Sequence, residues 1–389
     1  MRFRYSAGKN GRLVKKAQVF TRDEHKINVA DVDAEAVGII KKLKDSGFET
    51  YIVGGAVRDL ILGKKPKDFD IVSEASPARI KRIFRNSRII GRRFRLVHVY
   101  FGERIFEVST FRSIKDGPTG NTFGSIEEDV LRRDFGMNAL FYDPGQQVVV
   151  DYVGGMKDIR QKKVRPIIPL SEIFRDDPVR MIRAVKYAAA TGFALPLFLR
   201  WKIKKESGLL FSVSPSRLTE EILKIINSPQ AAAIVDALDR MGLYSYLQPQ
   251  AAKLMRETPG FRQRYLNSMS AAREQPLGAL VNDYMEGVAN WQLGIVENYK
   301  MVFAAARSFV LPMNPPRFQL EQAIRHFFAA HGVTIKKSML MTRAPAQAHD
   351  AETNPGRSKV RKRRRRHKPE TQADEKKTEQ GIKSNNPVL

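Results

Sequence analysis

The clearest alternation of apolar and polar positions lies in residues 51–72, YIVGGAVRDLILGKKPKDFDIV. Tyr51–Val53 is a short apolar run that stops at two glycines, which predicts a strand. From Ala56 to Leu62, apolar and charged residues alternate at helical spacing before another glycine, which predicts a short helix. A second strand is then expected to carry Asp68 and Asp70. We therefore expect strand, glycine turn, helix and strand in succession.

Shorter periodic segments extend this region into a mixed α+β domain. Ser76 and Pro77 form a typical helix start, and the acids after Ser125 suit the first turn of a helix. Residues 1–30 are polar and basic, and we expect a poorly ordered arm there. Helices are expected over 32–47, over 77–84 and from Ser125, and strands over 104–111, 139–142 and 148–152.

The second half of the chain has a different periodicity. From about Ser171 to about Met341 apolar positions recur at helical spacing, and Trp201, Trp291 and the region near Phe327 are interpreted as core residues. Residues 357–368 carry nine Lys and Arg side chains in twelve positions, a density that cannot pack. The expected division is a basic arm (1–30), a head (31–165), a helical neck (166–240), a helical body (241–342) and a disordered tail (343–389).

The charge of the chain adds an expectation about its partner. A formal net charge of +27 over 389 residues exceeds what solubility requires, and a single sign indicates a polyanionic partner. No long apolar run or basic amphipathic segment is present, so a membrane partner is not expected. The absence of cysteine excludes disulfides and thiolate metal sites, and the N-terminus has no secretory pattern. We expect a cytoplasmic protein.

The residues of the central stretch suggest a specific chemistry. Glycines at a strand-to-helix turn let backbone N–H groups approach a phosphate, so Gly54 and Gly55 are candidates for holding a triphosphate. Asp68 and Asp70 are two residues apart on the expected strand and would point to one side. Converging carboxylates repel unless a divalent cation lies between them, and oxygen ligands suit Mg²⁺ or Mn²⁺. The simpler alternative is a surface strand with two solvated acids.

Five blocks of the sequence resemble one known family. They are IVGGAVRDLILG with KDFDIV, FEVSTFR, EEDVLRRDFGMNAL, DYVGGMKDI and RDDPVRMIRAVKYAA, and they span roughly residues 20–240 in the family's order. In this respect the chain is similar to the class II template-independent nucleotidyltransferases, which comprise bacterial poly(A) polymerases and CCA-adding tRNA nucleotidyltransferases. The resemblance implies a polymerase-β-like head with a mixed sheet, an all-helical neck and body, and an enzyme that uses ATP and Mg²⁺ on RNA 3′ ends.

The resemblance also implies roles for individual residues. In each case a plain structural role stays open: an exposed strand acid for Glu107, a salt bridge to an arginine for Asp134, and a surface pair for Asp177 with Arg180. The implied metal ligands are Asp68, Asp70 and Glu107; the catalytic group is Asp68, Asp70 and Asp134; the nucleotide-binding group is Gly54, Gly55, Arg58, Arg133, Asp177, Arg180 and Arg183; and the RNA-binding group is Arg92, Arg93, Arg361, Lys362, Arg363, Arg364, Arg365 and Arg366.

Three segments resemble the poly(A) polymerase branch more than the CCA-adding branch. They are residues 89–102, the lead-in 20–33 and the basic tail. A CCA-adding enzyme and an inactive RNA-binding protein on the same scaffold are the alternatives. Two departures from the family pattern affect the site. Gly136 replaces a threonine in the RRDFTINA motif, and Asp176 replaces a glutamate in the Glu-Asp-x-x-Arg motif, which puts the nucleotide preference in question.

Overall fold

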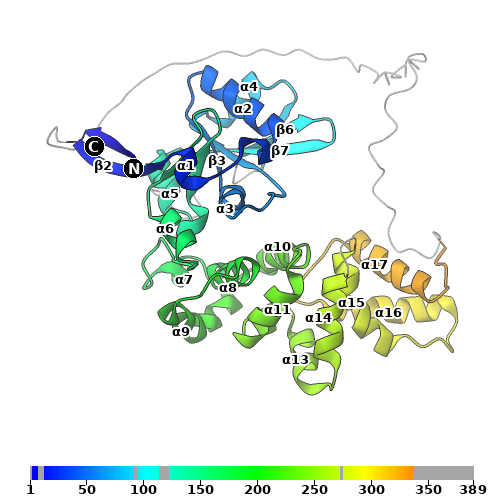
Figure 1. The fold of residues 1–389 in the computed structure, drawn as a ribbon. Helices are drawn as coiled ribbons and strands as arrows, with labels where there is room; N and C mark the ends of the chain where they lie inside the picture. The colour runs from blue at the N-terminus through cyan, green and yellow to red at the C-terminus, as the bar shows by residue number, and fades with distance from the viewer. Residues whose placement is uncertain (1, 8–12, 92–94, 114–121, 272–274, 337–389) are drawn as a thin grey trace, which may run out of the picture. The chain divides into compact units, whose positions relative to one another are not determined.

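The computed structural model describes residues 2–7, 13–91, 95–113, 122–271 and 275–336, all of which belong to one compact unit, Met1–Thr342. Within these ranges no helix combines the length and the apolar content needed to cross a bilayer. The head precedes a series of helices, as the sequence predicts (Figure 1).

One mixed sheet forms the centre of the head. Its strand order is β1-β2-β9-β8-β3-β4-β7-β6-β5, and β4 pairs with β7 in parallel while the other pairs are antiparallel. The strands expected at 51–53, 104–111, 139–142 and 148–152 are confirmed within a few residues. The strands are β1 Arg2–Ala7, β2 Leu13–Phe20, β3 Thr50–Val53, β4 Asp70–Ser73, β5 Ser87–Ile90, β6 Leu96–Phe101, β7 Arg104–Thr110, β8 Leu140–Asp143 and β9 Val148–Asp151.

The expectation of a poorly ordered N-terminal arm is wrong. β1 pairs with β2, and β2 pairs with β9 through Phe20 and Val149. Phe20 is 3% exposed, so this hairpin contributes to the core of the head. Lys15, Lys16 and a register shift at Arg4 interrupt the alternation of apolar residues, which is why the strand pattern is hard to see in the sequence.

The sheet buries both of its faces because its central strands are apolar at successive positions. Ile52 and Ile71 face the main core, while Tyr51 and Val72, one position away, face a second cluster beside α5. The helices expected over 32–47, over 77–84 and from Ser125 are confirmed. The head helices are α1 Arg22–His25, η1 Val29–Asp31, α2 Ala34–Asp45, α3 Gly55–Ile61, α4 Pro77–Ile83, α5 Ile126–Leu131, η2 Gly136–Asn138 and α6 Gly155–Arg160.

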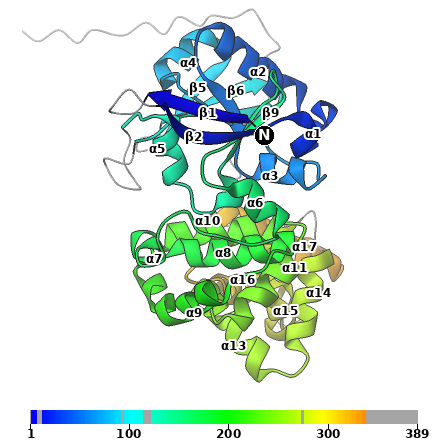
Figure 2. The same cartoon turned by 60° about the vertical axis from the view of Figure 1, so that its left-hand side comes forward.

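The remaining described chain is helical, as expected (Figure 2). Phe327 is buried as predicted, but Trp201 is 61% exposed and Trp291 is 45% exposed, so the expectation that both tryptophans are core residues is wrong. The elements are α7 Ile173–Asp176, α8 Val179–Thr191, α9 Leu197–Glu206, η3 Ser207–Ser212, α10 Pro215–Ile226, α11 Ala231–Arg240, α12 Tyr244–Leu247, α13 Pro249–Glu257, α14 Phe261–Ala271, α15 Pro276–Val288, α16 Ile295–Phe309 and α17 Arg317–Ala330.

Candidate active site

The glycine turn between β3 and α3 lies directly against an acidic side chain. Gly54 has φ 75°, a conformation that glycine adopts without steric cost, and α3 begins at Gly55. Val53 pairs with Asp70 across β3 and β4. A Cβ atom built on Gly54 would lie 3.6 Å from Asp70 Oδ2, so the carboxylate faces the turn at close range. This juxtaposition is the one that the sequence predicts.

The protein shifts the pKa of the Asp70 carboxyl group. Its side chain is open to solvent, but the protein around it raises its carboxyl pKa by desolvation, and the nearby Glu107 and Asp68 charges raise it further, against the opposing charge of Arg133. Among the described residues no hydrogen bond or ion pair satisfies this carboxylate. A cation would relieve the repulsion, so the chemistry of the site fits a divalent metal.

The three expected metal ligands are not gathered into one group. Asp68 precedes β4 rather than lying in it, and β7 places Glu107 on the neighbouring parallel strand. Glu107 lies opposite His98 on β6, and its Oε1 is 3.5 Å from His98 Nε2. In the described part of the chain, no set of three or more His, Cys, Asp and Glu side chains is placed to hold a metal ion. The charges of Glu107 and Asp68 both raise the pKa of Asp70, Glu107 the more strongly, so both acids lie near it.

Arg58 lies beside the glycine turn but already has protein partners. A Cβ atom built on Gly55 would lie 3.5 Å from its Nη2. The Arg58 guanidinium donates to Asp59 Oδ1 at 2.9 Å and to Asn138 Oδ1 at 2.8 Å, and the residue is 9% exposed. Arg58 is thus held in a fixed position at the turn, with part of its hydrogen-bonding capacity engaged.

Arg133 is anchored by a neighbouring acid on α5. Its Nη2 and Nε atoms lie 2.9 and 3.2 Å from Asp129 Oδ2, and Nη1 donates to the Asn138 carbonyl at 3.4 Å. The Arg133 charge lowers the pKa of Asp70, so it acts on the same site. Sequence reasoning missed Asp129 and Asn138, although both lie in the EEDVLRRDFGMNAL block.

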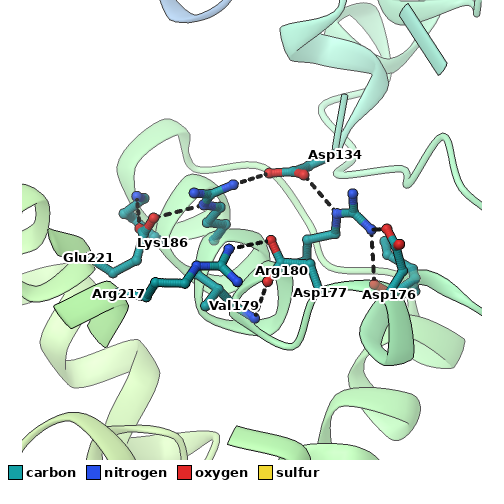
Figure 3. Close-up of polar contacts among 10 residues, drawn as sticks. Asp134, Asp176, Asp177, Val179, Arg180, Lys186, Arg217 and Glu221 are labelled. Carbon is teal, nitrogen blue, oxygen red and sulfur yellow. Dashed lines mark hydrogen bonds and ion pairs between the residues drawn. The ribbon is translucent and has the colours of Figure 1, made fainter. Parts of the chain in front are cut away.

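Asp134 forms ion pairs with two arginines of α8 (Figure 3). Its Oδ1 lies 2.8 Å from Arg180 Nε, and its Oδ2 lies 3.0 Å from Arg183 Nη1. Asp134 thus organises two of the expected nucleotide-binding residues, and the salt-bridge role left open by the sequence is the role that its contacts support.

Asp177 is fixed by the backbone and by another arginine. Its Oδ1 accepts from the Val179 N–H at 3.1 Å, and its Oδ2 accepts from Arg217 Nη2 at 2.8 Å. Arg180 pairs instead with Asp134 and with Asp176, the residue that departs from the family pattern. Asp177 and Arg180 are 8% and 2% exposed, so the alternative of a surface pair between them is not found.

A buried acid on α10, Glu221, holds Arg183 and Lys186 of α8 in position. Glu221 accepts from Arg183 Nε at 2.8 Å and from Lys186 Nζ at 2.6 Å, and it is 2% exposed. Burial raises the pKa of Glu221, but the charges and hydrogen bonds of Lys186 and Arg183 lower it to about 2. Sequence reasoning missed Lys186, Arg217 and Glu221. The signal for Lys186 and Glu221 is their polarity among buried apolar neighbours, whereas Arg217 is exposed and carries no such signal.

The departure at Gly136 has a packing reason. A Cβ atom built there would lie 2.0 Å from Asp158 Oδ2, and Asp158 is 3% exposed and held by Arg165 Nε at 2.8 Å. The threonine of the family pattern would require this pair to move. The expected RNA contacts of Arg92, Arg93 and Arg361–Arg366 lie outside the described residues.

Two segments of the chain match known protein families. Residues 50–165 match the poly A polymerase head domain, and residues 192–255 match a domain described as a probable RNA and SrmB-binding site of polymerase A. Both descriptions agree with the fold and with the acid-bearing glycine turn. The head is that of a nucleotidyltransferase.

The chain spans a little over half the length of the curated relatives that it matches. Poly(A) polymerase I of Escherichia coli O6:H1 is 40% identical over 61% of this chain and 55% of its own. The CCA-adding enzyme of Geobacillus kaustophilus is 37% identical over 60% of this chain and 59% of its own. The CCA-adding enzyme of Bacillus stearothermophilus, solved with CTP, superimposes with a TM-score of 0.53 at 29% identity, covering 77% of this chain and 82% of that one. The matched parts of the chain are therefore similar to poly(A) polymerases and CCA-adding enzymes.

Proposed function

We propose that this protein adds AMP units from ATP to RNA 3′ ends and releases pyrophosphate. The observation that carries the proposal is the position of Asp70, whose carboxylate faces the Gly54 turn at close range and has a raised pKa. An acid without a protein partner, beside a turn that can receive phosphate, is an arrangement suited to nucleotidyl transfer.

The chain's own residues supply binding and orientation in this reaction. Asp70 and Asp68 would provide the oxygen ligands for Mg²⁺ or Mn²⁺, which when bound neutralises phosphate charge and polarises the reacting phosphorus centre. Backbone N–H groups of the Gly54 turn and the Arg58 guanidinium would orient the triphosphate. Arg133 adds positive charge at the same site. Catalysis would then depend on positioning and on electrostatic stabilisation.

The base would be selected by Asp177, which lies just before α8, and by Arg180 on α8. Asp177 can accept from an exocyclic amine, and the Arg180 guanidinium can donate to a ring nitrogen. Both side chains are already held, by Arg217 and by Asp134, so their orientation is set before a nucleotide arrives. The use of ATP rather than CTP is inferred from the higher identity to poly(A) polymerase I.

A primer-extension assay tests the reaction. An end-labelled oligo(A) is incubated with ATP and Mg²⁺, and we expect many nucleotides to be added by the native chain and none by the Asp70→Asn variant. Asp45→Asn, an exposed acid on α2, is the matched control and is expected to retain full extension. Equal extension by Asp70→Asn and native protein, at equal melting temperature, would show that the mechanism is wrong.

A CCA-adding activity is the second candidate, and the superposition on the Bacillus stearothermophilus enzyme favours it. Supplying a tRNA that lacks its 3′ CCA, with ATP and CTP together, distinguishes the two. Addition that ends after three nucleotides would replace our proposal with this one. No incorporation on either RNA, with RNA binding retained, would identify an inactive RNA-binding protein.

A further inference from the structure

Helix α9 exposes an unusual amount of apolar surface. Leu197, Phe198 and Trp201 are 77%, 79% and 61% exposed. They lie within about one turn of each other on the same side of the helix, while Leu199 and Ile203 on the opposite side are 1% and 0% exposed. The helix is therefore attached to the molecule through its opposite side. Figure 2 shows α9 at the margin of the helical part. Large apolar side chains grouped in this way indicate a contact surface.

The same side of α9 is positively charged. Lys204 and Lys205 follow Trp201 by three and four residues and are exposed, so they continue the surface by one turn. Lys205 Nζ lies 4.8 Å from the centroid of the Trp201 ring. The one acid of the helix, Glu206, is engaged with Lys202 at 2.6 Å. We call the set Leu197, Phe198, Trp201, Lys204 and Lys205 the α9 outer face.

We propose that the α9 outer face is a base-stacking surface for single-stranded RNA, an inference that rests on the proposed function. Its aromatic rings can stack with bases, and its lysines can pair with the adjoining phosphates. Stacking of this kind tolerates any base, which suits a substrate whose body varies in sequence. The family description of residues 192–255 is a probable RNA and SrmB-binding site, and it names no contacting residue.

Charge decides between RNA and a protein partner. A strictly apolar face would suit either, but this one combines exposed aromatic rings with two lysines and no free acid, in a chain of net charge +27. Such a combination matches a polyanion that carries planar bases. A protein partner or a second copy of the chain becomes an outcome of the test.

The chain contains two tryptophans, which makes a direct optical test possible. In the Trp291→Phe variant, Trp201 is the single tryptophan, and its fluorescence is followed as single-stranded oligo(A) is added without ATP or metal. Trp201→Phe, with Trp291 as the single reporter, is the control. Stacking predicts quenching of Trp201 by oligo(A), little quenching by an abasic strand of equal length and charge, and an unchanged Trp291 signal.

Affinity measurements provide the second readout. Phe198→Ala with Trp201→Ala is expected to weaken oligo(A) binding on the order of tenfold or more, as for the loss of one or two stacked bases. Phe318→Ala, an exposed phenylalanine on α17, is the matched control and should bind normally. Because these side chains are exposed, all variants are expected to fold, and their melting temperatures verify it.

The outcomes separate this inference from the proposed function. Absent quenching of Trp201, equal quenching of both tryptophans, or unchanged affinity in the double variant would overturn the stacking surface. A change in sedimentation of the double variant with unchanged RNA affinity would assign the face to protein contacts instead. Quenching without primer extension would retain the surface and reject the polymerase activity, whereas extension without quenching would do the reverse.

Discussion

Asp134 in the head lies 2.8 Å from Arg180 in α8, measured between Oδ1 and Nε. Arg180 is 2% exposed, so this ion pair is shielded from solvent and from screening by salt. The head thereby fixes the orientation of a side chain that we propose to read the nucleotide base. Chemistry in the head and base selection would be coupled through one carboxylate.

Replacement of Asp134 by Asn should therefore affect both stability and nucleotide use. The change leaves two arginines without their shared counter-charge, and breaking a buried pair of this kind costs about 3 kcal/mol. We expect a lower melting temperature and a reduced kcat/KM for ATP. Glu172→Gln, an exposed acid ahead of α7, is the control. An unchanged kcat/KM in Asp134→Asn would contradict the positioning role.

Because the pKa of Glu221 is lowered, the folded protein should lose stability at acidic pH. Its pKa of about 2 in the folded protein is below the usual glutamate value near 4.5, so its stabilising effect is complete above about pH 4.5 and is lost as the pH falls toward about 2. Thermal unfolding measured between about pH 6 and pH 3 should show this decline. Glu221→Gln should lower stability at neutral pH and flatten the decline, while Glu220→Gln, its exposed neighbour, should change neither.

The N-terminal hairpin should be required for the stability of the head. Phe20 is 3% exposed, and Phe20→Ala is expected to cost about 3–5 kcal/mol because it removes a buried ring. Tyr5 on the adjacent strand is 54% exposed, and Tyr5→Ala should change stability by less than about 1 kcal/mol. Chemical denaturation measures both. Similar values for the two variants would argue against a packed hairpin.

Substitution by alanine should have opposite effects on stability at two glycines. A Cβ atom built on Gly155 would lie 2.1 Å from the Gly136 carbonyl oxygen, a backbone atom that cannot rotate away. Gly155→Ala should destabilise the protein by about 1–3 kcal/mol. At Gly38 within α2, an added methyl group would meet no atom within 4 Å, and Gly38→Ala should stabilise by about 0.5–1 kcal/mol. Equal effects on thermal unfolding would refute the close backbone contact.

Local periodicity predicts much of the head because its strands and helices have regular apolar spacing. The glycine turn and Asp70 are found together because they lie 16 residues apart and pair across adjacent strands. The paired strands β1 and β2 are missed because their lysines obscure the alternation. The prediction that Trp201 is buried is wrong because helical spacing alone does not show which side of the helix faces the protein.

Contacts between segments that are distant in the sequence could not be predicted from the sequence. Glu221 contacts Arg183 on α8, and Arg217 contacts Asp177 just before α8, each from about 40 residues away, and nothing in their immediate neighbours indicates these partners. Glu107 is expected at a metal, and the sequence gives no sign that its Oε1 lies 3.5 Å from His98 Nε2 on the adjoining strand. Which side chains share a site depends on how α8 and α10 pack, and this is a tertiary property.

Both carboxylate oxygens of Asp177 are occupied by the protein, one by the backbone of α8 and the other by α10. Each oxygen retains a second lone pair, so the acid can still accept a bond from a base, but only along directions that the two helices dictate. If Asp177 contacts the base as we propose, small changes in the angle between α8 and α10 would shift nucleotide preference in evolution while the side chain itself stays the same.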